Sequence, residues 1–69
     1  MRLSARNQID GRIVEVCKGQ TTAHVRLDIG NGVVITSSIT NEAVDQLGLK
    51  VGDAAIAVIK ASDVMVAIP

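Results

Sequence analysis

The chain has 69 residues, of which 48% are hydrophobic, and its seven basic residues balance seven acidic ones, but it contains no Phe, Tyr or Trp. One cysteine and one histidine exclude an internal disulfide and argue against a zinc site, which normally has four ligands. The balanced charge argues against a general nucleic-acid-binding protein, and no apolar run is long enough to span a membrane.

The length predicts one domain over residues 1–69. A domain of this size buries only about 60% of the surface that its unfolded chain exposes, so it usually needs a disulfide, a metal or a partner subunit. Because the composition argues against the first two, we expect the excess apolar surface to be buried between the subunits of a homo-oligomer. The N-terminus lacks the apolar segment of a signal peptide, which predicts a cytoplasmic protein whose Cys17 thiol is reduced and buried.

The first half of the chain predicts three strands. Residues Ile9–Cys17 are rich in Ile and Val, and Gly11 within them marks a bulge or a close approach of backbone. Residues Thr22–Ile29 alternate apolar and polar side chains, which is typical of a half-buried strand. The Gly30–Gly32 segment tolerates positive φ and so predicts a hairpin turn into a third strand over Val33–Ile39.

The second half begins with a change of pattern. Thr40 is a suitable N-cap and Gly48 a suitable stop for a two-turn helix over Asn41–Leu47. Residues Ala54–Lys60 are apolar on both faces, which predicts a buried strand, and a last strand is predicted over Val64–Ile68. This order predicts a mainly β fold, a small closed or nearly closed OB-like barrel of about five strands with one short helix.

Three groups of polar donors lie near the ends of the predicted strands. They provide hydroxyls, backbone N–H groups, one guanidinium and one ammonium, which are the groups that a tetrahedral dianion needs because it has acceptors and no donors. Each group alone has an ordinary structural explanation, as an exposed arm, strand hydroxyls or a solvated lysine, and only the combination predicts an oxyanion site. The groups are Ser4, Arg6 and Asn7; Thr36, Ser37, Ser38 and Thr40; and Lys60, Ala61 and Ser62.

Catalytic patterns do not emerge from the sequence. His24 falls on the polar face of an alternating strand, where we interpret it as solvated and not as the base that a catalytic serine needs. The GNG turn lacks the Lys-Ser/Thr pair of a phosphate-binding loop. We therefore predict that the protein is not an enzyme.

The segments SARNQIDGRIVEV, ITSSIT and AIAVIKASDVMV together resemble the molbindin (Mop) domain over essentially the whole chain. The resemblance implies a small OB-like barrel of the TOBE type that binds molybdate, and often tungstate, as the intact oxyanion. It implies intracellular storage or homeostasis, with no metal bonded directly to the protein. It also implies a homo-hexamer, built as a trimer of dimers, in which two subunits share each site.

The resemblance assigns the molybdate site position by position. Ala43 stands where many family members have Ser, so only its backbone N–H would remain as a donor there. Gly19 and Gln20 are assigned only loosely, to a second class of anion site near the threefold axis. The matched positions are Ser4, Ala5, Arg6, Thr40, Ala43, Lys60 and Ala61, with Asn7, Gly19, Gln20 and Ser62 as weaker candidates.

Two alternatives stay open at this point. An OB-type nucleic-acid-binding module would stack bases on aromatic side chains, which this chain lacks. A ligand-free domain that only drives oligomerisation would carry no bound oxyanion after purification. A molybdopterin ligand fits less well, because no aromatic residue is present to form the wall of a pterin pocket.

Overall fold

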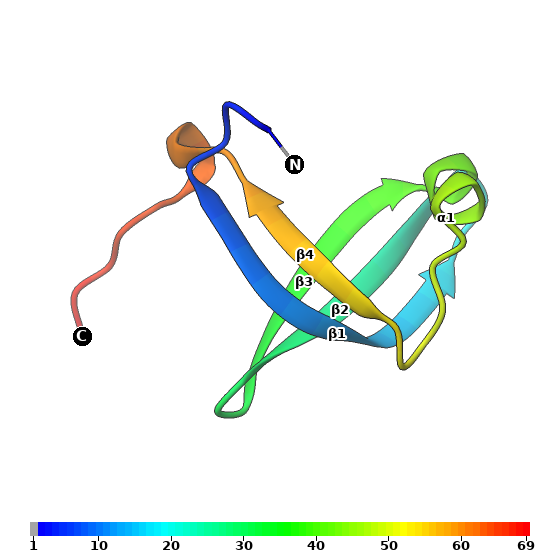
Figure 1. The fold of residues 1–69 in the computed structure, drawn as a ribbon, viewed down its shortest axis with the longest axis horizontal. Coiled ribbons are helices and arrows are strands. Elements are labelled where there is room, and N and C mark those ends of the chain that lie inside the picture. The colour runs from blue at the N-terminus through cyan, green and yellow to red at the C-terminus, as the bar shows by residue number, and fades with distance from the viewer. Residues whose placement is uncertain (1) are drawn as a thin grey trace.

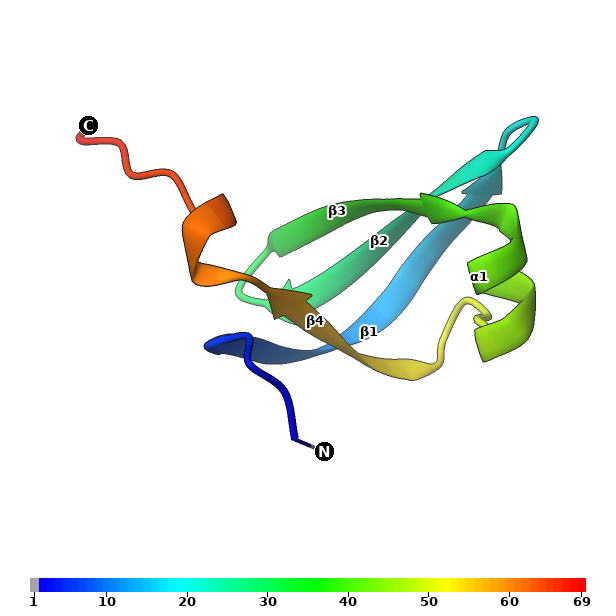
Figure 2. The same ribbon diagram turned by 90° about the horizontal axis from the view of Figure 1, so that it is seen from above.

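Four antiparallel strands form one sheet with the order β3-β2-β1-β4 in the computed structural model, which describes residues 2–69. The sheet curls, and the single α-helix lies at one end of it (Figures 1 and 2). The mainly β class with one short helix is therefore confirmed. In chain order the elements are β1 (Asn7–Lys18), β2 (Thr22–Gly30), β3 (Val33–Thr40), α1 (Asn41–Leu47), β4 (Ala54–Ile59) and the 3-10 turn η1 (Ala61–Asp63).

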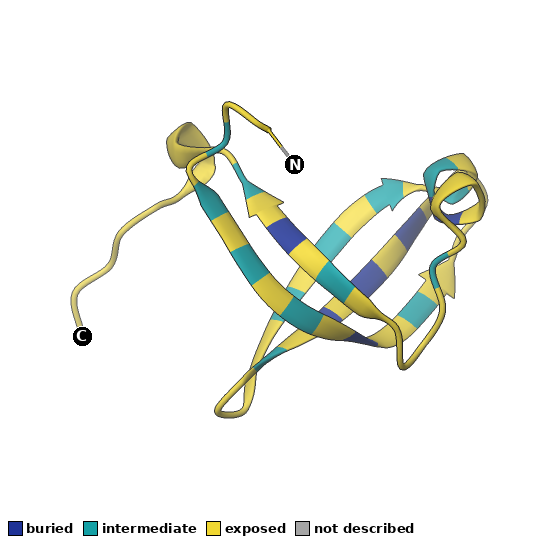
Figure 3. Ribbon diagram, viewed as in Figure 1, coloured by how far each residue is buried: buried dark blue, intermediate teal, exposed yellow. Residues whose placement is uncertain are grey.

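The core lies along the inner face of β2. Ala23, Val25 and Leu27 alternate with exposed polar residues, as the sequence predicted, and all three are buried (Figure 3). Ile13 from β1 and Val44 from α1 pack against them. This core is small and contains no aromatic side chain, so few buried side chains fill the interior of the curled sheet.

A β-bulge changes which face of β1 points inward. The register of β1 against β2 shifts between Ile13 and Glu15, so that Val14 is the extra residue. Beyond the shift the alternation reverses: Val16 is half-buried and Cys17 is exposed. The prediction of a buried Cys17 was wrong for this reason, because an unbroken alternation from Ile13 would have carried Cys17 inward.

Gly11 of β1 lies close to the backbone of β2, which confirms the predicted close approach. A Cβ at this position would lie 2.9 Å from the carbonyl oxygen of Asp28 and 3.1 Å from Cγ2 of Ile29. The nearest atom to such a Cβ therefore belongs to the backbone of β2, which cannot move aside as the end of a flexible side chain can.

We expect Gly11→Ala to lower the free energy of unfolding by about 1–3 kcal/mol, the usual cost of forcing an extra carbon into a packed contact. The measurement is urea unfolding at one fixed protein concentration. Asp10→Ala is the matched control, because Asp10 is an exposed neighbour on the same strand, and it should stay within about 0.5 kcal/mol of the parent protein. Equal stability of the two variants would contradict the close contact.

The short helix α1 has the ends that the sequence predicted. Its N-cap Thr40 accepts a hydrogen bond from the Ala43 backbone N–H at 3.0 Å. Its C-cap Gly48 has φ 63°, in the left-handed region, and donates to the backbone of the last turn. The helix therefore begins directly where β3 ends, and it fixes the Thr40 hydroxyl at that junction.

The second half departs from the prediction at β4 and at the C-terminus. Within the chain only Ala57 of β4 is buried, whereas Ile56 and Val58 are about 45% exposed, because the apolar strand lies at one edge of the sheet. The fifth strand expected over Val64–Ile68 does not form: η1 turns the chain away from β4, and this segment extends from the sheet without a pairing partner (Figures 1 and 2). No helix within residues 2–69 is long and apolar enough to cross a membrane.

Candidate anion-binding site

Two of the predicted donor groups meet at one end of the sheet. Strands β1 and β4 are antiparallel, with Asn7 paired to Ile59, so the residues before β1 and the residues after β4 lie next to each other (Figure 1). The Asn7 side-chain amide donates to the Ile59 carbonyl at 3.2 Å and ties the two strands together. We call this cluster the donor end, and it comprises Ser4, Ala5, Arg6, Lys60 and Ala61, with Ser62 beside them in η1.

The donors of this cluster are free to bind a ligand. Arg6 and Lys60 are exposed, and neither forms an ion pair with another residue in the range 2–69. Ala61 and Ser62 begin the 3-10 turn, where the first backbone N–H groups have no partner within the turn, and neither group donates a backbone hydrogen bond to another of residues 2–69. The donor end therefore offers two cations and unpaired N–H groups to an anion.

Thr40, Ala43, Gly19 and Gln20 lie at the opposite end of the sheet, beside α1. The other predicted donors of β3, Thr36, Ser37 and Ser38, pair with residues 24–26 of β2 and lie between the two ends. Beside α1, the Asn41 side-chain amide donates to the Gly19 carbonyl at 2.9 Å, which holds the helix against the turn after β1. The Thr40 hydroxyl receives the Ala43 N–H and keeps its own proton for another acceptor. The Ala43 N–H already has a partner, so an anion would have to share it. We call this cluster, Thr40 and Ala43 with Gly19 and Gln20 beside them, the helix end.

One chain cannot bring the two ends together. Strand β1 runs from the donor end to the helix end, and its 12 residues span about 36 Å along the strand at the usual rise per residue. Figure 1 shows the same separation, with the N-terminal segment and η1 at one side of the molecule and α1 at the other. Any site that uses both Arg6 and Thr40 must therefore be formed by two chains.

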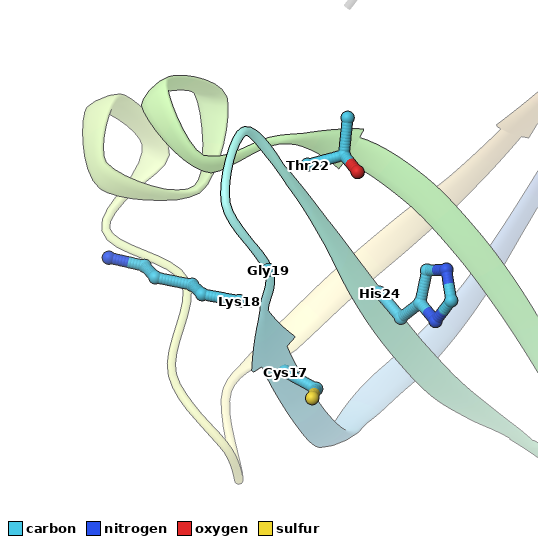
Figure 4. Close-up of a pocket in the computed structure, with 5 residues that line it drawn as sticks. All are labelled: Cys17, Lys18, Gly19, Thr22 and His24. Carbon is cyan, nitrogen blue, oxygen red and sulfur yellow. The ribbon is translucent and has the colours of Figure 1, made fainter.

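A shallow cavity of about 250 Å³ lies near the helix end and includes Gly19, which was predicted for the second class of anion site. It is lined by Cys17, Lys18, Gly19, Thr22 and His24 (Figure 4). The ammonium of Lys18 points away from Cys17 and His24 in Figure 4 and pairs with Asp45, while the Gly19 N–H donates to the Thr22 carbonyl at 2.7 Å.

The chain therefore gives Gly19 no free donor for an anion in this cavity. His24 is exposed, as predicted. No group of three or more potential metal ligands occurs among residues 2–69.

The sequence analysis did not anticipate a groove between the outer strands β3 and β4. This hollow of about 330 Å³ is lined by Ile35, Thr36 and Ser37 of β3 and by residues 56–59 of β4. The signal was present in β4, whose apolar residues on both faces indicated a second surface to be covered.

Comparison with known proteins identifies close relatives over the whole length. A family model described as "TOBE domain" matches residues 3–66. Molybdenum-pterin-binding protein 3 of Clostridium pasteurianum is 47% identical over 66 residues, which cover 96% of this chain and 97% of that protein.

Two solved structures share the fold. A molybdate-binding protein from Sporomusa ovata aligns with a TM-score of 0.92 at 31% identity and covers 99% of this chain and 100% of that one. The cytoplasmic molybdate-binding protein ModG, solved with molybdate bound, aligns with a TM-score of 0.94 at 48% identity. The alignment spans all of this chain and 49% of the ModG chain.

Proposed function

The chain belongs to the TOBE domain family as a Mop-type member, and from this premise we propose that residues 1–69 form one domain that binds molybdate for storage or homeostasis inside the cell. Its relatives are binding and transport proteins by name, and nothing in the proposal requires an enzymatic step. The observation that carries the proposal is the set of unpaired donors at the donor end, where Arg6 and Lys60 have no carboxylate partner among residues 2–69.

In the proposed site, the donor end of one subunit faces the helix end of another. Arg6 and Lys60 would neutralise the two negative charges, and the Ser4 and Thr40 hydroxyls and the Ala61 N–H would donate to the remaining oxygens. Each hydrogen bond to a charged group contributes about 1.5–3 kcal/mol net. Several of them together support a Kd near 1 μM, which is about −8 kcal/mol, after desolvation and ordering are subtracted.

A homo-oligomer is part of this proposal, and the arrangement we favour is a hexamer built as a trimer of dimers. The exposed apolar surface, which includes Leu47 at 69% and Val51 at 64% exposure, supports an oligomer because a partner subunit would cover it. The hexameric arrangement is what the resemblance to the Mop family implies. Ala43 and Gln20 lie at or near the helix end, and they would approach the anion only in such an assembly.

The names of the relatives also raise a molybdenum-pterin complex as ligand. A pterin ring is flat and apolar on its faces, so a binding pocket for it normally has aromatic walls. This chain has no aromatic residue, whereas the inorganic anion needs only donors and charge. We therefore propose the free oxyanion.

We expect titration calorimetry to detect binding of molybdate and of tungstate with Kd values within about tenfold of each other, since the two ions have the same charge, shape and nearly the same size. Sulfate and phosphate should bind at least about tenfold more weakly, because they are smaller and leave donors unsatisfied. Equal binding of sulfate would contradict the proposal. Native mass spectrometry of the purified oligomer separates it from a ligand-free assembly domain, which would carry no oxyanion.

A further inference from the structure

The side chain of Asn7 holds the peptide group that leads into Lys60. Its Nδ2 donates to the Ile59 carbonyl at 3.2 Å, across 52 positions of sequence, and this bond is partly buried. Asn7 and Ile59 also form the last pair of the β1–β4 ladder, so Lys60 is the first residue beyond the end of β4. The side-chain bond therefore fixes the chain at the point where strand pairing stops.

The peptide groups on both sides of Lys60 are held by their carbonyls. Asn7 occupies the Ile59 carbonyl before it. The Asp63 backbone N–H occupies the carbonyl of Lys60 itself at 2.9 Å. No peptide bond within residues 2–69 is cis, and in a planar trans peptide the C=O and the N–H point in opposite directions. The two bonds therefore set the directions in which the N–H groups of Lys60 and Ala61 point.

A second side-chain amide has the corresponding place before Arg6. Gln8 Nε2 donates to the Ala5 carbonyl, which leads into Arg6, at 3.4 Å. This bond is exposed and longer than the usual range of about 2.7–3.2 Å, so it constrains the backbone less than the Asn7 bond does. The two carbonyls that receive these amides are thus the ones directly before the two cations of the donor end.

We propose that Asn7 is a positioning residue of the anion site, which holds Lys60 and the Ala61 N–H in place and is not itself a ligand. The inference rests on the proposed function, because it concerns the same site. Donors that are held before the anion arrives need not be ordered on binding, and this saving increases the affinity. Gln8 has the same role before Arg6, with a smaller effect because its bond is longer.

A double-mutant cycle measured by titration calorimetry tests whether Asn7 acts through Lys60. Asn7→Ala should raise the molybdate Kd about tenfold in the parent protein. In a Lys60→Ala background it should raise Kd by less than about threefold, because a residue that acts through another has a non-additive effect. The same factor in both backgrounds would show a contribution independent of Lys60, as from a direct ligand, and would overturn the inference. An unchanged Kd of Asn7→Ala in the parent protein would also overturn it.

The first control replaces the amide and keeps the size of the side chain. Leucine branches at the same carbon as asparagine but cannot donate a hydrogen bond, so Asn7→Leu should weaken molybdate binding as much as Asn7→Ala does. Binding by Asn7→Leu that equals binding by the parent protein would show that packing, and not the bond to Ile59, is what matters at this position. That result would overturn the inference.

The second control removes a comparable bond at the far end of the same ladder. Arg12 pairs with Ala54, and its Nη1 donates to the Gly52 carbonyl, 40 positions along the chain. Arg12→Ala should keep the molybdate Kd within about twofold of the parent, because the five residues between positions 7 and 12 span more than a Debye length of roughly 8–10 Å. A loss equal to that of Asn7→Ala would show general loosening of the sheet and contradict a specific role.

NMR relaxation of the protein without molybdate separates this inference from the proposed function. The order parameters of the Lys60 and Ala61 N–H groups should be near about 0.85 in the parent and fall toward about 0.6 in Asn7→Ala, with no change in Arg12→Ala. Unchanged values in Asn7→Ala would overturn the positioning role even if the protein binds molybdate. A parent protein that shows the expected values but binds no molybdate would instead overturn the proposed function, and with it the role of Asn7 toward an anion.

Discussion

Replacing Arg6 by alanine is expected to weaken molybdate binding by at least about 100-fold, because a guanidinium can form two charge-assisted hydrogen bonds to an oxyanion, each worth about 1.5–3 kcal/mol. Arg6 also supplies one of the two positive charges of the donor end. The substitution should leave the barrel folded, because Arg6 is exposed, precedes β1 and pairs with no residue in the range 2–69. Titration calorimetry measures the affinity, and urea unfolding checks the fold.

Arg26→Ala is the matched control for this experiment. Arg26 is an exposed residue in the middle of β2 and lies 3.6 Å from a carboxylate oxygen of Glu15, so its removal changes the net charge by the same amount at a distance from both ends of the sheet. We expect Arg26→Ala to bind molybdate within about twofold of the parent, since exposed charges are screened over a Debye length of roughly 8–10 Å. Binding by Arg6→Ala that equals binding by Arg26→Ala would show that Arg6 is not a ligand.

The elements that the sequence predicted well are those set by local patterns. The alternation over Thr22–Ile29, the GNG turn and the Thr40 and Gly48 caps of the helix each depend on residues within a few positions of one another. Backbone propensity and side-chain periodicity decide such features before any long-range contact forms. For this reason the structure reproduces the helix Asn41–Leu47 at the predicted residues.

The features that escaped prediction depend on contacts between distant segments. The bulge at Val14 reverses which face of β1 points inward, and no feature of the sequence around Val14 indicates it. The sequence instead predicted a bulge or a close approach at Gly11, where the structure has the close approach. Residues Val64–Ile68 have the local composition of a strand, yet a strand forms only where it pairs with another strand. The turn η1 carries this segment away from β4, so it stays unpaired.

The candidate site divides in the same way. The sequence identified the donors by their chemistry and combined them into one predicted site, but it did not show that the groups around Arg6 and Lys60 lie at the same end of the sheet. Their meeting follows from the pairing of Asn7 with Ile59, residues that lie 52 positions apart. Thr40 pairs with Thr22 at the end of the β2–β3 hairpin, which places it at the other end of the sheet. Because the two sets of donors are separated in this way, a site that uses both requires two subunits.

Mixing two inactive variants should restore binding if each site is shared between subunits. Arg6→Ala disables the donor end. Thr40→Asp disables the helix end by placing a carboxylate against the anion, while Asp still serves as an N-cap and keeps the helix. Each variant alone should lose binding. When equal amounts are unfolded and refolded together, each half of a site is intact in about half of the subunits, so about a quarter of all sites regain both halves under random assembly.

The reciprocal mixture separates the shared site from a site within one chain. Wild-type protein refolded with an equal amount of the double variant, Arg6→Ala plus Thr40→Asp, contains the same number of substituted residues as the first mixture. Shared sites leave about a quarter of the sites intact in this mixture, whereas sites within one chain leave about half. Equilibrium dialysis with molybdenum quantified by mass spectrometry measures the fraction. Because the donor end and the helix end lie at opposite ends of the sheet, we expect about a quarter of the sites to bind molybdate in both mixtures. No binding in the first mixture and binding at about half of the sites in the second would show that one chain forms the whole site.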